Sequence, residues 1–326
     1  MQSLNIFMHE LLDYAGLFPP AKLTLQESLL NYSSYTKHKQ KNWLGKFILP
    51  SNKIEDCIEI MLNQKFFKSN DTNLNFSIIL NSWEKFNDFN KIIDSDLKSL
   101  KNFESTFKNN IHIDSIEFLP PKEVFQPSNL SLFKNMLFLV NDKLLNVNKL
   151  KFKFLEIPFS ENINEYIEFI SEFNTQHKDT NFCIKLRTGG VTPNQIPSAF
   201  HIAQAIRLSA EKQIPIKTTA GLHVPVPNDN PEVGARLHGF FNIFSCLLLC
   251  YKKLLTISEM ENILTNYSYS DFKFTEEGLT IGNKFLANVE MTQLRNSFIK
   301  SFGTCSFLEP IEHLHENNFL EGKKHA

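Results

Sequence analysis

Short apolar runs rich in β-branched and aromatic residues recur along the chain, and segments with the spacing of amphipathic helices lie between several of them. The apolar runs predict strands at 45–50, 75–80, 114–119, 136–140, 153–159, 182–187 and 215–220. Helical spacing is found at 23–39, 54–67, 164–176 and 196–213. Such alternation, with near-continuously apolar strands, is typical of an α/β fold with a covered parallel sheet.

Seven predicted strands, with an eighth at 15–20 or in the C-terminal part, favour a closed (β/α)8 fold like the TIM barrel. The alternative is an open doubly wound parallel sheet, which is less favoured because no glycine-rich phosphate turn follows the first strands. We expect a barrel-like domain at 1–250 and C-terminal α+β additions, helices and a hairpin packed on the barrel, at 251–326.

The C-terminal addition departs from the strand–helix rhythm. Ser258 and Glu261 form a candidate capping box for a helix near 259–266. The sequence then predicts a hairpin at 272–282, a helix near 289–301 and a loop at 302–310. A separate region, 120–152, leaves little room for a full helix beside its predicted strand.

Charged residues interrupt three predicted strands at positions where a barrel strand should be apolar. They are Glu156, then Lys185 and Arg187, then Lys217, which shares its strand face with Thr219. A charge buried under the helices is costly unless it is paired. We therefore expect these side chains to point into the barrel near its C-terminal mouth, together with Glu117.

Two interpretations of this charge cluster stay open. It is either a buried ion-pair network that sets strand register without chemistry, or part of an active site. Position favours an active site, because barrel enzymes carry their catalytic residues at the C-terminal strand ends. Both 182–187 and 215–220 also run directly into glycine-containing loops.

These loops carry further candidate binding residues. The N–H groups of Thr188, Gly189 and Gly190 can face an anion, and the planar guanidinium of Arg187 suits a carboxylate or phosphate. The second loop, 220–239, is long for its place and contains Gly221, His223 and His238 as candidate substrate-binding residues. The segment has no HxH or HExxH spacing, so we predict no metal site and no other cofactor.

Composition and charge narrow the partners. With 34 Lys+Arg against 35 Asp+Glu the net charge is −1, so there is no basic footprint for nucleic acid. The longest apolar run, 239–251, is too short to cross a bilayer. Five scattered cysteines without a CxxC pair, and an N-terminus unlike a signal peptide, lead us to expect a cytoplasmic protein. The expected partner is a small anionic metabolite, and the sequence does not give the oligomeric state.

Five segments together resemble a family of uncharacterised bacterial proteins. They are DYAGLFPPA (13–21), KLRTGGVTP (185–193), KTTAGLHVP (217–225), HGFFNIF (238–244) and FGTCSFLEP (302–310). The resemblance implies no activity, but it draws attention to Asp13, Tyr14, Asn242 and Glu309. Val224 departs from the family's pattern, which often has a second histidine there.

A more local likeness suggests a reaction. The segment 217–221, KTTAG, is similar to the strand-end KTSTG of deoxyribose-phosphate aldolases, a family whose lysine forms a Schiff base. A buried lysine beside a second cation is nucleophilic as the neutral amine. This favours a lyase or aldolase acting on a small anionic carbonyl compound, with Lys217 as nucleophile, Glu156 as general acid or base, and Lys185 in support.

Two other functions are compatible with the same residues. One is a metal-assisted isomerase or hydrolase that uses His223, His238 and Glu156. The other is a non-catalytic barrel that binds a small molecule.

Overall fold

Eight parallel strands form a closed barrel in the part of the chain that the computed structural model describes, residues 1–64, 66, 73–145, 147, 150–177 and 181–320. The strands are β1 Leu12–Tyr14, β2 Leu44–Pro50, β3 Leu74–Ile79, β4 Ile111–Phe118, β5 Phe152–Glu156, β6 Phe182–Arg187, β7 Ile216–Thr219 and β13 Ile299–Thr304. Their order is β1-β13-β7-β6-β5-β4-β3-β2. The predicted (β/α)8 fold class is confirmed.

Two compact units make up the chain. The first unit comprises residues 1–22, 35–45 and 186–326, and the second unit comprises 23–34 and 46–185.

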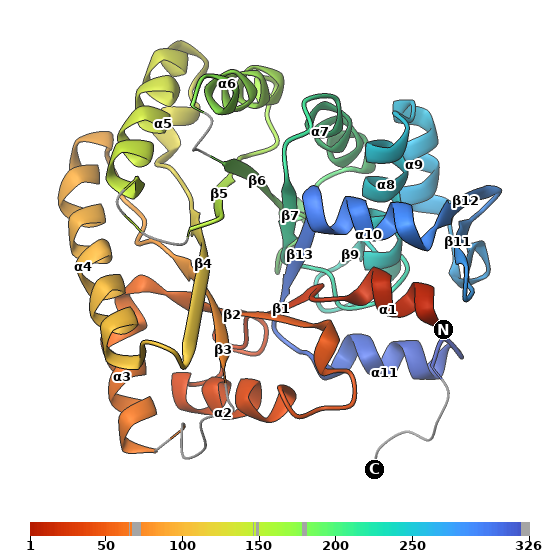
Figure 1. The fold of residues 1–326 in the computed structure, drawn as a ribbon. Coiled ribbons are helices and arrows are strands. Elements are labelled where there is room, and N and C mark those ends of the chain that lie inside the picture. The colour runs from red at the N-terminus through yellow and green to blue at the C-terminus, as the bar shows by residue number, and fades with distance from the viewer. Residues whose placement is uncertain (65, 67–72, 146, 148–149, 178–180, 321–326) are drawn as a thin grey trace. The chain divides into compact units, whose positions relative to one another are not determined.

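In the second unit, parallel strands pair in sequence order, with Phe47 of β2 beside Phe76 of β3 and Glu117 of β4 beside Phe154 of β5. Figure 1 shows the helices of this unit around the outside of its strands. They are α3 Ile54–Asn63, α4 Phe89–Phe107, α5 Leu130–Leu144 and α6 Ile163–Gln176, with most of α2 Leu25–Tyr35. Aromatic rings fill the layer between: Phe76 lies 5.7 Å from Phe47 and 5.1 Å from Phe103, between ring centroids.

The prediction of a strand at 136–140 is wrong, because this run lies within α5. The buried residues of α5 are spaced three and four apart, at Phe133, Met136, Leu137, Val140, Asn141 and Leu144. Phe138, in the middle of the apolar run, is 51% exposed. The run therefore contains the apolar face of an amphipathic helix, in a region where the sequence left little room for one.

In the first unit, β13 pairs in parallel with both β1 and β7. The helices of this unit are α1 Gln2–Met8, α7 Ala199–Glu211, α8 Phe240–Lys252, α9 Ile257–Asn266, α10 Asn288–Ser297 and α11 Leu308–Glu316. Helix α8 is buried almost all round, which agrees with its nearly continuous apolar sequence, and it packs against α7 and α9.

One of the two remaining barrel strands, β13, lies in the C-terminal part, which is one of the two places that the sequence allows for an eighth strand, although the segment itself was expected to be helix and loop. Strand β1 precedes the candidate strand 15–20, and β13 occupies 299–304. The barrel is therefore not confined to 1–250. Phe302 explains the assignment of β13: it is fully buried and stacks on Phe240, with 5.5 Å between ring centroids.

The C-terminal segment between α8 and β13 follows the predicted pattern with one shift. Helix α9 begins two residues earlier than expected, because Thr256 and Glu259 form its capping box, not Ser258 and Glu261. The predicted hairpin is present as β10 Phe272–Phe274 and β11 Gly278–Ile281, extended by β12 Lys284–Ala287. The long loop after β7 contains a small hairpin, β8 Asn228–Asn230 with β9 Ala235–Leu237.

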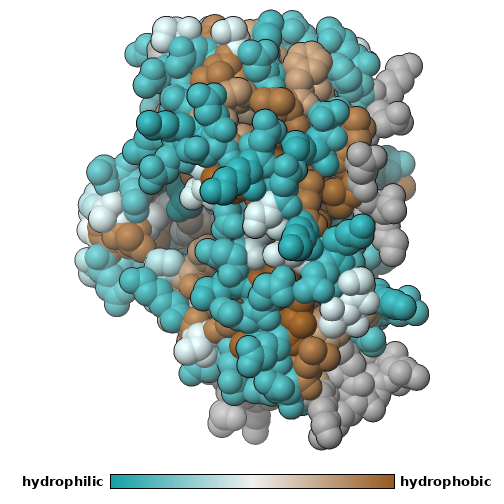
Figure 2. All heavy atoms as spheres, turned by 90° about the vertical axis from the view of Figure 1, so that its left-hand side faces the viewer, coloured by the Kyte–Doolittle hydropathy of each residue, from teal (hydrophilic) through white to brown (hydrophobic). Residues whose placement is uncertain are grey.

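Among the described residues, no helix has the length and apolarity that crossing a bilayer requires. Seen from the side of α3 and α4, the surface is mostly hydrophilic, with hydrophobic side chains in narrow streaks (Figure 2).

Candidate functional site

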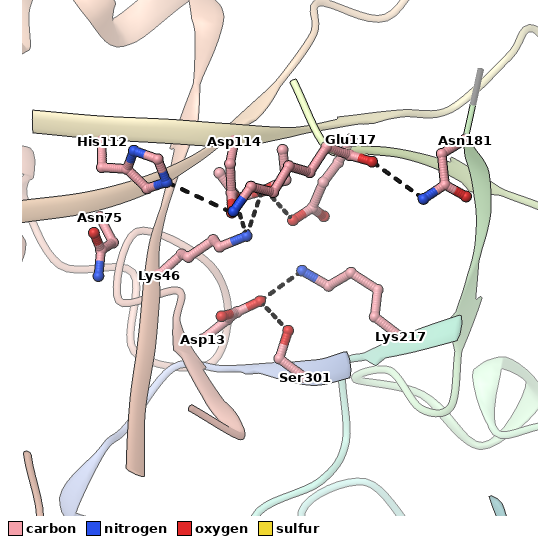
Figure 3. Close-up of polar contacts among 12 residues, drawn as sticks. Asp13, Lys46, Asn75, His112, Asp114, Glu117, Asn181, Lys217 and Ser301 are labelled. Atoms are coloured by element: carbon pink, nitrogen blue, oxygen red, sulfur yellow. Dashed lines mark hydrogen bonds and ion pairs between the residues drawn. The ribbon is translucent and has the colours of Figure 1, made fainter. Parts of the chain in front are cut away.

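Lys217 lies inside the first unit and contacts a carboxylate from a distant part of the chain. Its Nζ is 2.7 Å from Oδ2 of Asp13, and both side chains are 2% exposed. Ser301 Oγ donates a hydrogen bond to the same oxygen of Asp13. Figure 3 shows one oxygen of Asp13 contacting both partners. Strands β1, β7 and β13 thus each contribute one member to what we call the Asp13 cluster.

A glycine makes room for this carboxylate. A Cβ atom on Gly45, at the start of β2, would lie 2.3 Å from Oδ1 of Asp13. Real Cβ atoms do not approach that closely, so any other residue here would displace the acid. Since a buried charge without its partner is costly, the fold depends on Asp13 staying against Lys217.

The loops that follow β6 and β7 are in direct contact. The Thr188 N–H donates to the Thr219 carbonyl at 2.9 Å, and the Thr188 hydroxyl donates to the Ala220 carbonyl at 2.9 Å. A Cβ on Gly189 would lie 2.6 Å from Cα of Gly221, which itself has a φ of +77°. Glycines at both positions let the two loops touch beyond the strand ends.

The predicted anion loop is only partly available. The N–H of Thr188 is used by Thr219, whereas no hydrogen bond to the N–H groups of Gly189 and Gly190 is found within the described part of the chain. Arg187, the last residue of β6, is exposed. Arg187 therefore lies at the solvent side of the strand end, Gly190 is partly exposed and Gly189 is buried.

The two candidate histidines have different surroundings. His223, after β7, has its Nδ1 2.9 Å from Oε2 of Glu309 in the first turn of α11, and its side chain is 19% exposed. His238 is buried, and its Nε2 donates to the Pro197 carbonyl at 2.8 Å. Burial lowers the pKa of His238, which favours the neutral ring in this structural contact.

The second unit has a charge cluster of its own, the Glu117 cluster. Lys185 lies between two carboxylates, with Nζ 2.9 Å from Glu117 and 3.0 Å from Glu156. Ser77 Oγ donates to the other oxygen of Glu117 at 2.7 Å. The three charged side chains are at most 10% exposed. The sequence expectation that Glu117, Glu156 and Lys185 lie together agrees with this arrangement.

A further ion pair in the second unit was not anticipated. Lys46 of β2 contacts Asp114 of β4 and donates to Ser115 at 3.0 Å, and His112 lies 3.7 Å from Asp114 (Figure 3). Burial opposes ionisation of Asp114, but Lys46, together with His112 and Lys151, lowers the pKa of that carboxyl.

Sequence reasoning missed Ser301, Ser77, Gly45 and the Lys46–Asp114 pair. A polar residue at a strand position was the available signal for Ser77 and Lys46. No such signal existed for Ser301, because its strand was expected to be helix.

Each of the three residues named in the alternative metal-assisted hypothesis has another partner. Glu156 is bound to Lys185, His223 to Glu309 and His238 to a carbonyl group. Over the described residues, no group of three or more His, Cys, Asp or Glu side chains is placed to hold a metal ion.

A cleft of about 620 Å³ lies elsewhere, beside the N-terminal half of β4 and between α4 and α5. Its polar lining includes Lys101, Lys108, His112 and Lys143. Since barrel active sites lie at the opposite, C-terminal strand ends, this cleft does not belong to the candidate site.

No known protein-family model, curated protein sequence or solved structure matches this chain. The resemblance of the five motifs to bacterial proteins therefore stays a prediction.

Proposed function

We propose that this chain is a barrel enzyme of the lyase or aldolase class, with Lys217 as the amine that forms a Schiff base with a small anionic carbonyl compound. The observation that carries the proposal is the buried contact between Lys217 and Asp13, inside a barrel. An amine needs a base nearby before it can attack a carbonyl carbon, and Asp13 is at hydrogen-bond distance.

Proton transfer within this pair accounts for the chemistry. Lys217 passes a proton to Asp13, which turns two buried charges into two neutral groups, a change that burial favours. The neutral amine then adds to the substrate carbonyl, and Asp13 returns the proton to the departing hydroxyl as water leaves. The products of this step are an iminium ion on Lys217, a carboxylate on Asp13 and one water molecule.

The surroundings of Lys185 favour Lys217 as the nucleophile. Lys185 is held by Glu117 and Glu156, and loss of its proton would leave two neighbouring buried carboxylates without their shared cation. We therefore assign Lys185 a supporting role in holding the carboxylates, and Arg187 with Gly189 and Gly190 the role of binding the substrate's anionic group at the strand end.

Borohydride reduction in the presence of pyruvate or dihydroxyacetone phosphate tests the proposal. We expect a reduced adduct on Lys217, located by peptide mass spectrometry, in the wild type and in Lys185→Met. Lys217→Met should form none. Because removal of one partner of a buried ion pair costs about 3–5 kcal/mol, the double variant Asp13→Asn/Lys217→Met serves as the better-folded negative control.

An adduct that persists in Lys217→Met, or that maps to Lys185, would contradict the assignment. A wild-type protein that gives no adduct with either compound would count against Schiff-base chemistry.

A further inference from the structure

A histidine–glutamate pair lies beyond the same two strands that carry Lys217 and Ser301. Strand β7 ends at Thr219, and His223 follows four residues later. Strand β13 ends at Thr304, and Glu309 follows five residues later. Since Gly303 of β13 pairs with Thr219 of β7, the two strands end side by side. The pair therefore lies at the C-terminal strand ends, where barrel enzymes carry their catalytic groups.

The contacts of this pair determine which ring nitrogen of His223 can accept a proton. Nδ1 is 2.9 Å from Oε2 of Glu309. Because a carboxylate can only accept, Nδ1 carries the ring proton and donates a hydrogen bond to Oε2. Nε2 of the neutral ring is then the acceptor. Within the described residues, no hydrogen-bond partner of Nε2 is found.

Glu309 is itself held in place and ionised. Its N–H donates to Ser306 Oγ at 3.1 Å, and it lies in the first turn of α11, where the helix dipole favours negative charge. The hydrogen bond from His223 lowers the pKa of Glu309. A carboxylate fixed in this way orients an imidazole and stabilises the imidazolium that forms when the ring takes up a proton.

We propose that His223, oriented by Glu309, is the acid–base group that moves protons to and from the substrate in the reaction of Lys217. The inference rests on the proposed function and adds a substrate class to it. That class is a carbonyl compound with a hydroxyl group on the β carbon.

The cleavage step balances without any co-reactant. Nε2 of His223 takes the proton of the β-hydroxyl, and the bond between the α and β carbons breaks. The β fragment leaves as a carbonyl compound, while the electron pair moves toward the iminium nitrogen and forms an enamine. The imidazolium then returns its proton to the α carbon, and water hydrolyses the restored iminium to free Lys217.

The last proton transfer can be tested without knowing the cleaved substrate. In D₂O, proton NMR follows exchange of the α hydrogens of whichever probe is trapped on Lys217, pyruvate or dihydroxyacetone phosphate. We expect His223→Gln to keep the borohydride adduct but to lose exchange by about 10²–10⁴-fold, the usual contribution of a general acid–base group. Glu309→Gln, whose amide oxygen can still accept from Nδ1, should retain more exchange than Glu309→Ala.

The same helix offers a matched control. His313, one helical turn after Glu309, forms a similar pair with Glu316, at 3.5 Å. We expect His313→Gln to leave both adduct and exchange unchanged. Unchanged exchange in His223→Gln, with the adduct present, would overturn the role of His223 and leave the Schiff base intact. A wild type without adduct would overturn both.

Discussion

The carboxylate of Asp13 is surrounded by groups that only this fold could supply. It accepts from Lys217 and Ser301, and Gly45 leaves the space that it fills. Lys153 has different surroundings: the residue is 5% exposed, and the ring of Phe182 lies 5.8 Å from its Nζ. Burial lowers the pKa of Lys153. The buried charged residues of these strands therefore have different neighbours. These neighbours, and not the residue type alone, determine the pKa of each side chain.

Gly45→Ala tests the space beside Asp13. The added methyl group would meet the carboxylate, so we expect a loss of about 1–3 kcal/mol in the free energy of unfolding, as for other overpacked sites. Borohydride trapping at Lys217 should also fall. Urea unfolding measures the first effect and adduct yield the second.

An Asp13→Ala background provides the control for that clash. In that background, Gly45→Ala should lower the free energy of unfolding clearly less than it does in the wild type, since residues in contact are energetically coupled. Equal costs in both backgrounds would show that the carboxylate is not what the methyl group meets.

At the level of elements, helix α9 shows how a start signal is chosen between neighbours. Both Thr256/Glu259 and Ser258/Glu261 have capping-box spacing, and only tertiary position selects one. In the structure, Thr256 N donates to Glu259 at 2.9 Å, and Glu259 N donates to Thr256 Oγ1 at 3.2 Å. Lys284 of β12 also contacts Glu259, at 3.2 Å, which ties this end of the helix to the hairpin.

Substitution of the two candidate caps separates them. Thr256→Ala should lower the free energy of unfolding by about 0.5–2 kcal/mol, the usual cost of removing a side-chain cap. Ser258→Ala, inside the helix, should change it much less. Thermal or urea unfolding measures both effects. A larger loss of stability in Ser258→Ala than in Thr256→Ala would mean that the helix begins where the sequence alone suggested.

The same cap predicts a pH dependence. Hydrogen bonds from Thr256, with Lys284 in support, lower the pKa of Glu259 from 4.5 to about 2. A carboxyl whose pKa is lowered by folding stabilises the protein above its unfolded pKa, and this contribution is lost as the pH falls toward the folded value. The effect is modest because the side chain is 44% exposed. Glu259→Gln should therefore flatten the fall in stability between pH 4.5 and about 2.

At the level of the whole molecule, the barrel draws strands from both ends of the chain. Lys217 and Asp13 are 204 residues apart in sequence, and Ser301 and Asp13 are 288 apart. Pairing of β13 with both β1 and β7 makes these contacts part of one sheet. Segment 299–304 is thus a central strand and not a surface loop.

Hydrogen exchange measures that difference directly. We expect amides 299–304 to be protected as strongly as those of β7, because both strands belong to the cooperative barrel. The turn at 276–277 should exchange quickly and serves as the internal reference. Fast exchange across 299–304 would mean that β13 is not a stable barrel strand.

The sequence by itself determined the α/β alternation, most strand positions and the polar residues at the ends of β6 and β7. These follow from local periodicity and from the cost of burying charge, both of which can be judged within one segment. It also placed Lys185 with two acidic residues, because strand alternation puts them on one barrel face.

Only the tertiary structure decided that 136–140 is helical, that β13 completes the barrel and that Lys217 meets Asp13. An apolar run of five residues fits a strand or a helix face equally well until its neighbours are known. The partner of a buried charge depends on which distant strands pair, and that pairing is set by closure of the barrel as a whole.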